Sequence, residues 1–232
     1  MSTEGDGREK LLGVGLYTVS ESVSVIQLRL GDRVDNRVLL RWAQGRRELA
    51  KEYGSIIGAP LKIEGNYLFT FSQLIELLTI AAFRSHGVKP RVVRNAYKRA
   101  LQKFGKHPFA REGYRTDGVY IYTGGDEPAS EELSKQQTFF EEIVRPILMD
   151  VSYVDGNAVQ FSPLGTQRSV VLDPKVSFGA PVDRSSGVST AVLYAMRHSG
   201  ESEESVADWY GVNVSAVRDA FEYESSIRKI AA

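Results

Sequence analysis

The chain has 232 residues, no Cys, 29 Lys and Arg, and 29 Asp and Glu, so its formal net charge is zero. This length allows one large core or two smaller ones, and hydrophobic and charged fractions of 42% and 25% are typical of a globular protein. The absence of Cys excludes disulfides, thiolate metal sites and a cysteine nucleophile. A polar N-terminal stretch and short apolar runs indicate neither a signal peptide nor a membrane span, so we expect a cytoplasmic protein.

The zero net charge is the sum of two oppositely charged halves. Residues 1–116 contain 20 Lys and Arg against 11 Asp and Glu, whereas residues 117–232 contain 9 against 18. Such an asymmetry indicates one half that faces nucleic acid and another half with a different role. The alternative is that the charges are scattered over two ordinary solvated surfaces. The positions of the charges distinguish between these two interpretations.

The N-terminal part predicts two short helices joined by a turn. A capping box formed by Thr18 and Glu21 starts the first helix, which we expect to extend to about Ile26. A turn at residues 31–32 precedes the second helix, which Gly45 ends. Val38, Leu39 and Trp42 form the apolar face of the second helix. Arg37 and Arg41 form its basic face.

A strand pair and two longer helices are predicted next. Residues 67–71 form one strand, with a partner within residues 55–66. A second capping box at Thr70 then opens a helix that is apolar nearly all round. The following helix begins near Pro90 and runs to about Phe104. Its basic face comprises Arg91, Arg94, Lys98, Arg99 and Lys103.

The middle of the chain is expected to be a linker with small β-elements, followed by a helical C-terminal part. Residues 115–136 are rich in turn dipeptides around a short strand at 119–122, and a helix over about 135–145 ends before Pro146. Asp155, Gly156 and Asn157 predict a β-hairpin. The remaining elements are strands at 151–154, 158–161 and 170–172 and helices near 189–199, 202–210 and 214–230.

Little in the sequence points to catalysis. The three His residues lie far apart at positions 86, 107 and 198, without the spacing of metal ligands, and there is no Walker loop or Gly-rich dinucleotide motif. The adjacent acidic pairs at 141–142 and 203–204 cannot face one another on a helix. We therefore expect a protein that is not an enzyme and that uses no metal or cofactor.

DNA binding is better supported. Two short helices, a strand pair and two further helices follow the order of a winged helix-turn-helix, in which the second helix lies in the major groove. Six Arg within 19 positions, at 29, 33, 37, 41, 46 and 47, surround that second helix with only Asp32 and Asp35 to offset them. Arg suits both phosphate and guanine, and Asn36 could read adenine. The residues expected to contact DNA are Thr18, Arg33, Asn36, Arg37, Arg41, Arg46, Arg47, Arg91 and Arg94.

The C-terminal helices also have the rhythm of a helix-turn-helix, but their charge favours a protein contact. Residues 199–224 contain seven acidic side chains and one basic side chain, Arg218, so phosphate would repel this surface. The aromatic residues nearby are typical of a core, and one or two could instead anchor a dimer or a partner: Trp209, Tyr210, Phe221 and Tyr223.

Two stretches resemble a known family. Residues 16–45 (LYTVSESVSV…LLRWAQG) and 68–110 (LFTFSQLIELLTIAAFRSHGVKPRVVRNAYKRALQKFGKHPFA) are similar to the MerR-like DNA-binding region of VapB-type antitoxins. Residues 170–224 resemble the small helical domain of unknown function that closes those proteins. The matching motif residues there are Asp173, Pro174, Phe178, Gly179, Pro181, Val182, Gly187, Val188 and Thr190. One departure is an apparent insertion at residues 27–34.

The resemblance implies the antitoxin of a type II toxin–antitoxin module. Such a protein neutralises a co-encoded toxin, here a PIN-like ribonuclease, and represses its own operon through DNA binding. We expect a homodimer, because such motifs usually bind two half-sites. A PIN-like nuclease binds metal through carboxylates, so an Arg of the antitoxin could insert among them, and Arg184 and Arg197 are the candidates on charge alone.

The expected fold is α+β and mainly α, with three parts. These are a winged helix-turn-helix at 14–115, a β-containing middle at 116–169, and a helical domain at 170–232 for dimerisation or toxin binding. The alternative function is a MerR-like regulator that senses a small ligand, with an aromatic pocket lined by Tyr114, Tyr120, Tyr122 and Tyr153. A purely structural scaffold that does not bind DNA is a third possibility.

Overall fold

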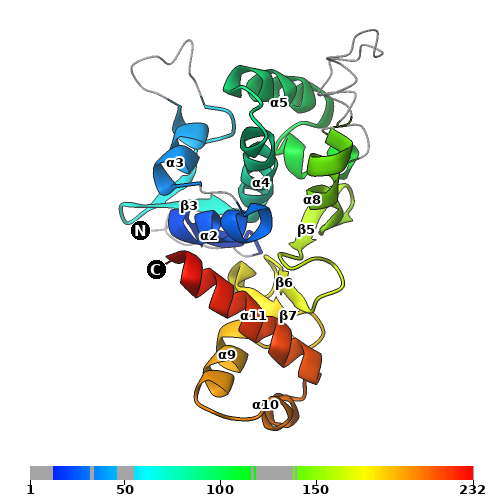
Figure 1. Cartoon of the computed structure of the whole chain (residues 1–232). Helices are drawn as coiled ribbons and strands as arrows, with labels where there is room; N and C mark the ends of the chain where they lie inside the picture. Colours follow the sequence, from blue (N-terminus) through cyan, green and yellow to red (C-terminus); the bar gives the residue numbers. More distant parts are fainter. Residues whose placement is uncertain are drawn as a thin grey trace, which may run out of the picture.

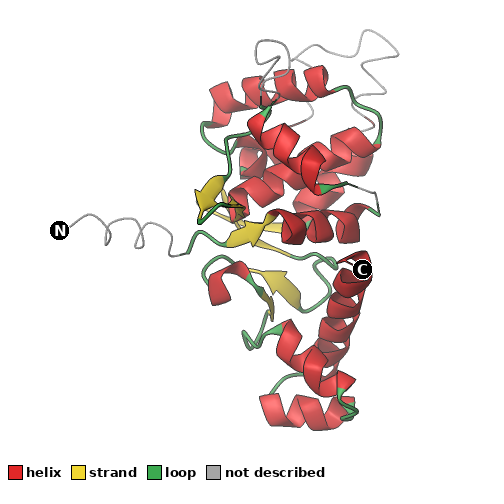
Figure 2. Cartoon of the chain, turned by 90° about the vertical axis from the view of Figure 1, so that its left-hand side faces the viewer, coloured by secondary structure: helices red, strands yellow, loops and turns green. Residues whose placement is uncertain are grey.

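The computed structural model describes residues 13–31, 34–45, 55–115, 118, 138 and 140–231. Over these residues the protein is an α+β structure in which helices predominate, as the sequence predicts. Figures 1 and 2 show an elongated molecule with α5 (Pro90–Phe104) at one end, and α9 (Thr190–His198) and α10 (Glu203–Tyr210) at the other. None of the described helices is both long enough and apolar enough to cross a membrane.

The N-terminal part combines a small antiparallel sheet with two short helices. Its elements are β1 (Leu16–Thr18), α2 (Val19–Leu30), α3 (Asn36–Gln44), β2 (Leu61–Ile63) and β3 (Asn66–Thr70). β3 lies between β1 and β2, so that Tyr17 pairs with Phe69 and Lys62 pairs with Tyr67. The sequence predicts both helices and the β2–β3 hairpin. It does not predict β1, which is defined by pairing with a strand that is distant in sequence.

The first helix is longer than expected. α2 continues to Leu30, and Gly31 ends it with a left-handed backbone (φ 69°). The Gln27 side chain then donates a hydrogen bond of 2.7 Å to the Val34 carbonyl, which ties the end of α2 to the start of the next helix. Part of the apparent insertion at 27–34 therefore belongs to α2, and residues 32 and 33 lie outside the described residues.

The main core is built around α4 (Phe71–Ser85). The predicted capping box at Thr70 is present, with Gln73 as its partner, and every residue from 73 to 83 is buried. Pro90 starts α5, which turns Val93, Ala96 and Ala100 inward. Both helices thus follow the prediction. α4 is buried on all sides, because a helix that is apolar all round is stable only when its whole surface is covered. The short η2 helix (Pro108–Ala110) packs against α4 and α5.

The helix that was expected to end before Pro146 continues through this residue. A π-helical segment, η3 (Phe140–Val144), leads directly into α8 (Arg145–Met149), which has Pro146 in its first turn. Proline has no N–H to donate, and here it lies next to the junction of the π-helical and α-helical segments, where the regular pattern of helical hydrogen bonds is already interrupted. The predicted helix end is therefore wrong. Most of the predicted linker at 115–136, with its strand at 119–122, lies outside the described residues.

A four-stranded antiparallel sheet joins the middle of the chain to the C-terminal part. Its strands lie in the order β4 (Val151–Val154), β5 (Asn157–Phe161), β6 (Val170–Leu172) and β7 (Pro181–Asp183). Asp155 and Gly156 form the predicted two-residue turn, with φ of 49° and 72°. Phe161 pairs with Leu172, and Leu172 belongs to the same buried core as Tyr17. The sheet thus spans the expected boundary at 169–170, and the functional division at this boundary stays a prediction.

The last three helices form a second, smaller core. α9, α10 and α11 (Val214–Ala231) match the predicted helices. The residues that they bury together are Leu193, Val206, Ala207, Val217 and Ala220. α11 is long enough to reach back to the N-terminal part, where its end packs against α2 (Figure 1). The last of the three C-terminal helices is therefore in direct contact with the first N-terminal helix.

Candidate functional site

The first helix of the candidate DNA-binding motif is held by its cap. The Thr18 hydroxyl accepts a hydrogen bond of 3.1 Å from the Glu21 amide and donates one of 2.8 Å to the Glu21 carboxylate. That carboxylate also accepts a bond of 2.7 Å from the Thr18 amide. Thr18 is exposed, as a phosphate contact requires, but its hydroxyl already has two partners within the chain. A contact with DNA would have to replace or share one of them.

The second helix presents the polar face that the sequence predicts. Asp35 caps α3 by accepting a hydrogen bond of 2.7 Å from the Val38 amide. Leu39 and Trp42 are buried, and this orients the opposite face, where Arg37 and Arg41 are exposed. Residues four apart are neighbours on a helix, so the two guanidinium groups lie on one face. Neither forms an ion pair with another described residue.

Asn36 stands beside these Arg residues at the start of α3. Its side-chain amide donates a hydrogen bond of 3.1 Å to the Ser20 hydroxyl of α2, which joins the two helices. A shallow hollow of about 350 Å³ lies here between α2 and α3, lined by Val23, Gln27, Val34, Asp35, Asn36 and Arg37. Asn36 is exposed, and its side-chain carbonyl has no hydrogen-bond partner among the described residues. Of the carbonyl and the NH2 group that a contact with adenine would use, the carbonyl is therefore available.

The predicted Arg cluster is smaller on the surface than it is in the sequence. Arg29 turns inward and forms a hydrogen-bonded ion pair with the buried Asp150, at 2.6 and 2.8 Å. It links α2 to the residue after α8 and is a structural residue, which contradicts its place in the basic cluster. Arg33, Arg46 and Arg47 lie outside the described residues. The described part of the cluster therefore consists of Arg37 and Arg41.

The basic face of α5 is present, but its residues differ in their exposure to solvent. Arg91 is exposed, as are Lys98 and Lys103, whereas Arg94 is half-buried and engaged in an interaction within the fold. Figure 1 places α5 and α3 in the half of the molecule remote from α10. Arg91 is consequently the better placed of the two predicted backbone contacts.

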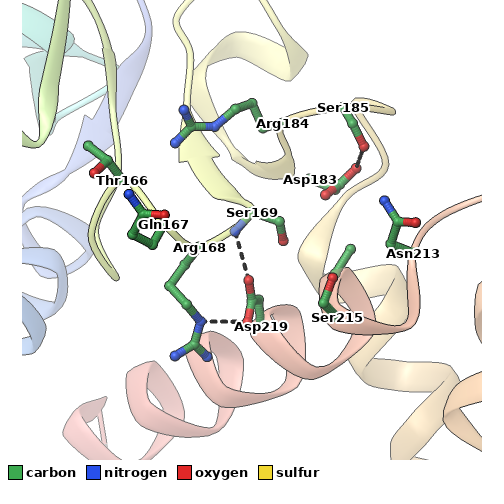
Figure 3. Close-up of a pocket in the computed structure, with 11 residues that line it drawn as sticks. Thr166, Gln167, Arg168, Ser169, Asp183, Arg184, Ser185, Asn213, Ser215 and Asp219 are labelled. Carbon is green, nitrogen blue, oxygen red and sulfur yellow. Dashed lines mark hydrogen bonds and ion pairs between the residues drawn. The ribbon is translucent and has the colours of Figure 1, made fainter.

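A polar pocket of about 390 Å³ occupies the C-terminal part, between the ends of β6 and β7 and the start of α11 (Figure 3). Asp219 of α11 accepts hydrogen bonds from the Arg168 side chain at 2.6 Å and the Ser169 amide at 2.7 Å. Asp183 accepts bonds from Ser185 and Ser186. Burial alone would raise the pKa of Asp183, but these hydrogen bonds lower it below its ordinary value.

The pocket positions one of the two predicted toxin contacts. Arg184 is exposed, and its guanidinium donates a hydrogen bond of 2.8 Å to the Ser162 hydroxyl. Figure 3 shows this side chain extended away from Asp183 and Ser185. Because one bond leaves most of the N–H groups of a guanidinium available, Arg184 could still bind a carboxylate of a partner.

Arg197, the other predicted toxin contact, has an evident structural role. Its guanidinium donates to the Glu201 carbonyl just after α9 and lies over the Phe221 ring, 5.9 Å from the ring centroid. The side chain is half-buried. It therefore closes the end of α9 and packs against α11, and no described contact brings it together with Arg184.

The acidic C-terminal surface is partly neutralised by bases from elsewhere in the chain. Arg168, which lies outside the window 199–224, forms ion pairs with Asp219 and Glu222. Arg218 pairs with Glu203. Because the window includes Arg218 but omits Arg168, a sum over it overstates the negative charge of the surface. Exposed acids nevertheless remain on α10, at Glu204 and Asp208, next to the 59% exposed Trp209.

The aromatic pocket of the alternative hypothesis is not formed by the residues that the structure describes. Tyr114 is fully buried and packs on Phe109 and Phe140, with ring centroids 4.4 and 5.7 Å apart. Tyr153 is half-buried under the Arg115 guanidinium. Tyr120 and Tyr122 lie outside the described residues. Within the described ranges, no group of three or more His, Asp or Glu is placed to hold a metal ion.

Sequence reasoning missed the residues that join the two ends of the molecule. Tyr17 donates a hydrogen bond of 2.9 Å to the Gly179 carbonyl, in the η4 turn (Ser177–Gly179). Arg168 and Asp219 are likewise far apart in sequence. A single sequence contains no local signal for such pairs, because neither partner lies within one helix or hairpin of the other.

Comparisons with known proteins find similarity in the C-terminal part and along most of the chain. Residues 170–223 match a protein family of unknown function, DUF433. The chain is 26% identical over 229 residues to a Mycobacterium tuberculosis protein named as a candidate antitoxin, VapB45, and the match covers 90% of this chain and 93% of that protein. It is also similar to the crystal structure of Rv2018 from Mycobacterium tuberculosis, with a TM-score of 0.70, 26% identity, and coverage of 90% of this chain and 98% of that chain. The fold is thus shared almost end to end with a solved structure.

Proposed function

We propose that this protein is the antitoxin of a type II toxin–antitoxin module. It would neutralise a PIN-like ribonuclease toxin by direct binding and repress its own operon by binding DNA. The observation that carries this proposal is the similarity to a candidate VapB45 antitoxin over 90% of the chain. The match covers the candidate DNA-binding helices together with the C-terminal part and supports the antitoxin role, whereas DNA binding is supported by the exposed Arg37 and Arg41 of α3.

In this proposal, residues 14–115 form a MerR-like winged helix-turn-helix. α2 and α3 are its two helices, and the β2–β3 hairpin that follows them is the wing. The second helix of such a motif enters the major groove, and the exposed Arg37 and Arg41 of α3 suit this position. Lys62, exposed on the hairpin, and Arg91, exposed on α5, would contact the flanking phosphates.

The C-terminal part, residues 170–232, is proposed to bind the toxin, the second copy of a homodimer, or both. Arg184 is the stronger of the two candidate toxin contacts, because it is exposed and its guanidinium makes a single hydrogen bond to the described residues. The exposed acids of α10 disfavour DNA as the ligand of this end. The ligand-responsive regulator is less well supported, because Tyr114 of its proposed pocket is a core residue.

Operator binding can be tested by fluorescence anisotropy with the duplex that lies upstream of the gene. We expect Arg37→Ala and Arg41→Ala each to weaken binding by about 1–3 kcal/mol, because Arg contacts to bases or phosphates are lost. Arg91→Ala should reduce the slope of log affinity against log salt by about one unit. Arg218→Ala, which removes an exposed charge that pairs with Glu203 of α10, in the end of the molecule remote from α3 and α5, is the control and should change little. Unchanged binding by all three Arg variants would overturn this assignment.

A further inference from the structure

An apolar groove lies where α2, the η4 turn and the C-terminal half of α11 meet. Its volume is about 480 Å³, within the range of cavities that accept a ligand or a group of partner side chains. Leu16, Val25, Leu172, Pro181 and Ile227 supply apolar surface to its wall. Residues from both ends of the chain thus line the groove. Tyr17, which is one of them, donates a hydrogen bond to the Gly179 carbonyl.

Phe178 lies on this groove in an unusual state. It is 69% exposed, and its backbone is left-handed (φ 57°, ψ 25°), as is that of Ser177 (φ 47°). This conformation is rare for an aromatic residue. The turn is held by hydrogen bonds from the Gly179 amide to the Val176 carbonyl, at 2.9 Å, and from the Tyr17 hydroxyl to the Gly179 carbonyl. The fold therefore keeps a large apolar ring in water at the expense of backbone strain, which is typical of binding surfaces.

The polar part of the groove is acidic. Glu21 and Glu224 line it, and none of the described residues that line it is Lys or Arg. Thr190 donates a hydrogen bond of 2.6 Å to Glu224, and Arg228, which does not line the groove, forms an ion pair with the Glu224 carboxylate at 3.9 Å. Burial raises the pKa of the neighbouring Tyr223 hydroxyl, and the charges of Glu224 and Glu21 raise it further. A ligand of this groove is consequently favoured if it combines apolar surface with positive charge.

We propose that this groove is a docking site for the toxin, and that its occupant is an apolar toxin side chain next to a Lys or Arg. The apolar side chain would cover Phe178, and the basic group would approach Glu21 and Glu224. The inference rests on the proposed antitoxin function and adds the binding surface and the chemistry of the toxin segment. It is independent of Arg184, which does not line this groove.

The test measures the affinity of the full chain for the purified toxin encoded by the adjacent gene, by isothermal titration calorimetry. Phe178→Gly removes the ring and suits the left-handed backbone, so the fold should be kept. We expect at least about tenfold weaker toxin binding. Met149→Ala is the matched control, since Met149 is 55% exposed at the end of α8 and does not line the groove; the affinity of this variant should stay within about twofold of the wild type.

The charge is tested separately. Glu21→Gln keeps the capping box, in which Gln can replace Glu, and should weaken binding at low salt and flatten its salt dependence. Glu142→Gln, at an exposed acid of η3 that does not line the groove, should do neither. If the complex forms and both groove variants bind as the wild type does, the groove proposal is overturned while the antitoxin proposal stands. If the wild type binds no toxin, both are overturned. If Phe178→Gly instead dissociates a homodimer and leaves toxin affinity unchanged, the occupant is a second copy and the toxin assignment is overturned.

Discussion

The Tyr17 hydroxyl donates a hydrogen bond of 2.9 Å to the Gly179 carbonyl, and this bond joins residues that are 162 positions apart. Gly179 has a φ of 89°, and a Cβ placed there would lie 2.5 Å from the Tyr17 hydroxyl oxygen. Burial raises the pKa of Tyr17, and Glu21 and Asp173 raise it further, so the hydroxyl remains a donor at neutral pH. The contact thus couples β1, which leads into the proposed DNA-binding helices, to the C-terminal part.

Removing this hydroxyl should lower the stability of the whole chain. Tyr17→Phe leaves the ring in place but deprives the Gly179 carbonyl of its donor, so we expect the free energy of unfolding to fall by about 1–2 kcal/mol. Urea denaturation followed by circular dichroism measures this change. Tyr67→Phe, at a half-buried tyrosine in β3, is the control. Equal losses in the two variants would show that the bond contributes nothing specific.

Substitution of Gly179 should lower the free energy of unfolding more than substitution of a turn glycine does. Gly179→Ala introduces both left-handed strain and a clash with Tyr17, whereas Gly156→Ala introduces strain alone, because no atom lies within 4 Å of its Cβ position. We expect losses of about 2 kcal/mol or more for the first and about 1 kcal/mol for the second, measured by the same denaturation. A Gly179→Ala variant as stable as Gly156→Ala would contradict the close approach.

The ion pair at Asp219 should matter more than the ion pair at Glu203. Arg168→Ala leaves the Asp219 carboxylate, which is 10% exposed, without its cation. Since the Arg168 side chain is itself 35% exposed, solvent weakens the pair, and the expected loss of stability is about 1–2 kcal/mol. Arg218→Ala breaks a more exposed pair and should have little effect on the thermal midpoint. The reverse order of the two variants would contradict this account of the C-terminal part.

The buried Glu76 predicts a defined pH dependence. Burial raises its pKa above the ordinary value of 4.5, although the hydrogen bond with His107, 3.0 Å away, and one with Tyr97 act in the opposite direction. A carboxyl whose pKa is raised by folding favours the fold fully below its unfolded pKa, and this contribution is lost as the pH rises through the folded pKa. The stability of Glu76→Gln relative to the wild type should therefore increase as the pH rises above 4.5, in urea denaturations at a series of pH values. A relative stability that decreases over this range would mean that ionised Glu76 is stabilised by His107.

Local features of the fold could be predicted from the sequence. The capping boxes at Thr18 and Thr70 start their helices as predicted, since a cap requires only residues three positions apart. The turn at Asp155 and Gly156 and the three C-terminal helices are equally local. The exposure of Arg37 and Arg41 follows from the apolar period of α3, which fixes the opposite face.

Features that depend on distant partners could not be predicted. β1 and β7 have three residues each and are strands only through pairing with β3 and β6. Arg29 looked like a member of the basic cluster because its partner, Asp150, lies 121 positions away. The family resemblance identifies Phe178 only as a motif residue, and a left-handed backbone has no sequence signal in a residue other than glycine.

The most direct test of the antitoxin proposal is a titration of the purified chain against the ribonuclease activity of the protein encoded by the adjacent gene. The substrate is a fluorescent RNA, and the divalent metal is in excess so that chelation cannot cause inhibition. We predict that RNA cleavage falls to background when the chain and the nuclease are present in equal amounts. Full cleavage with an excess of this chain would contradict the proposal.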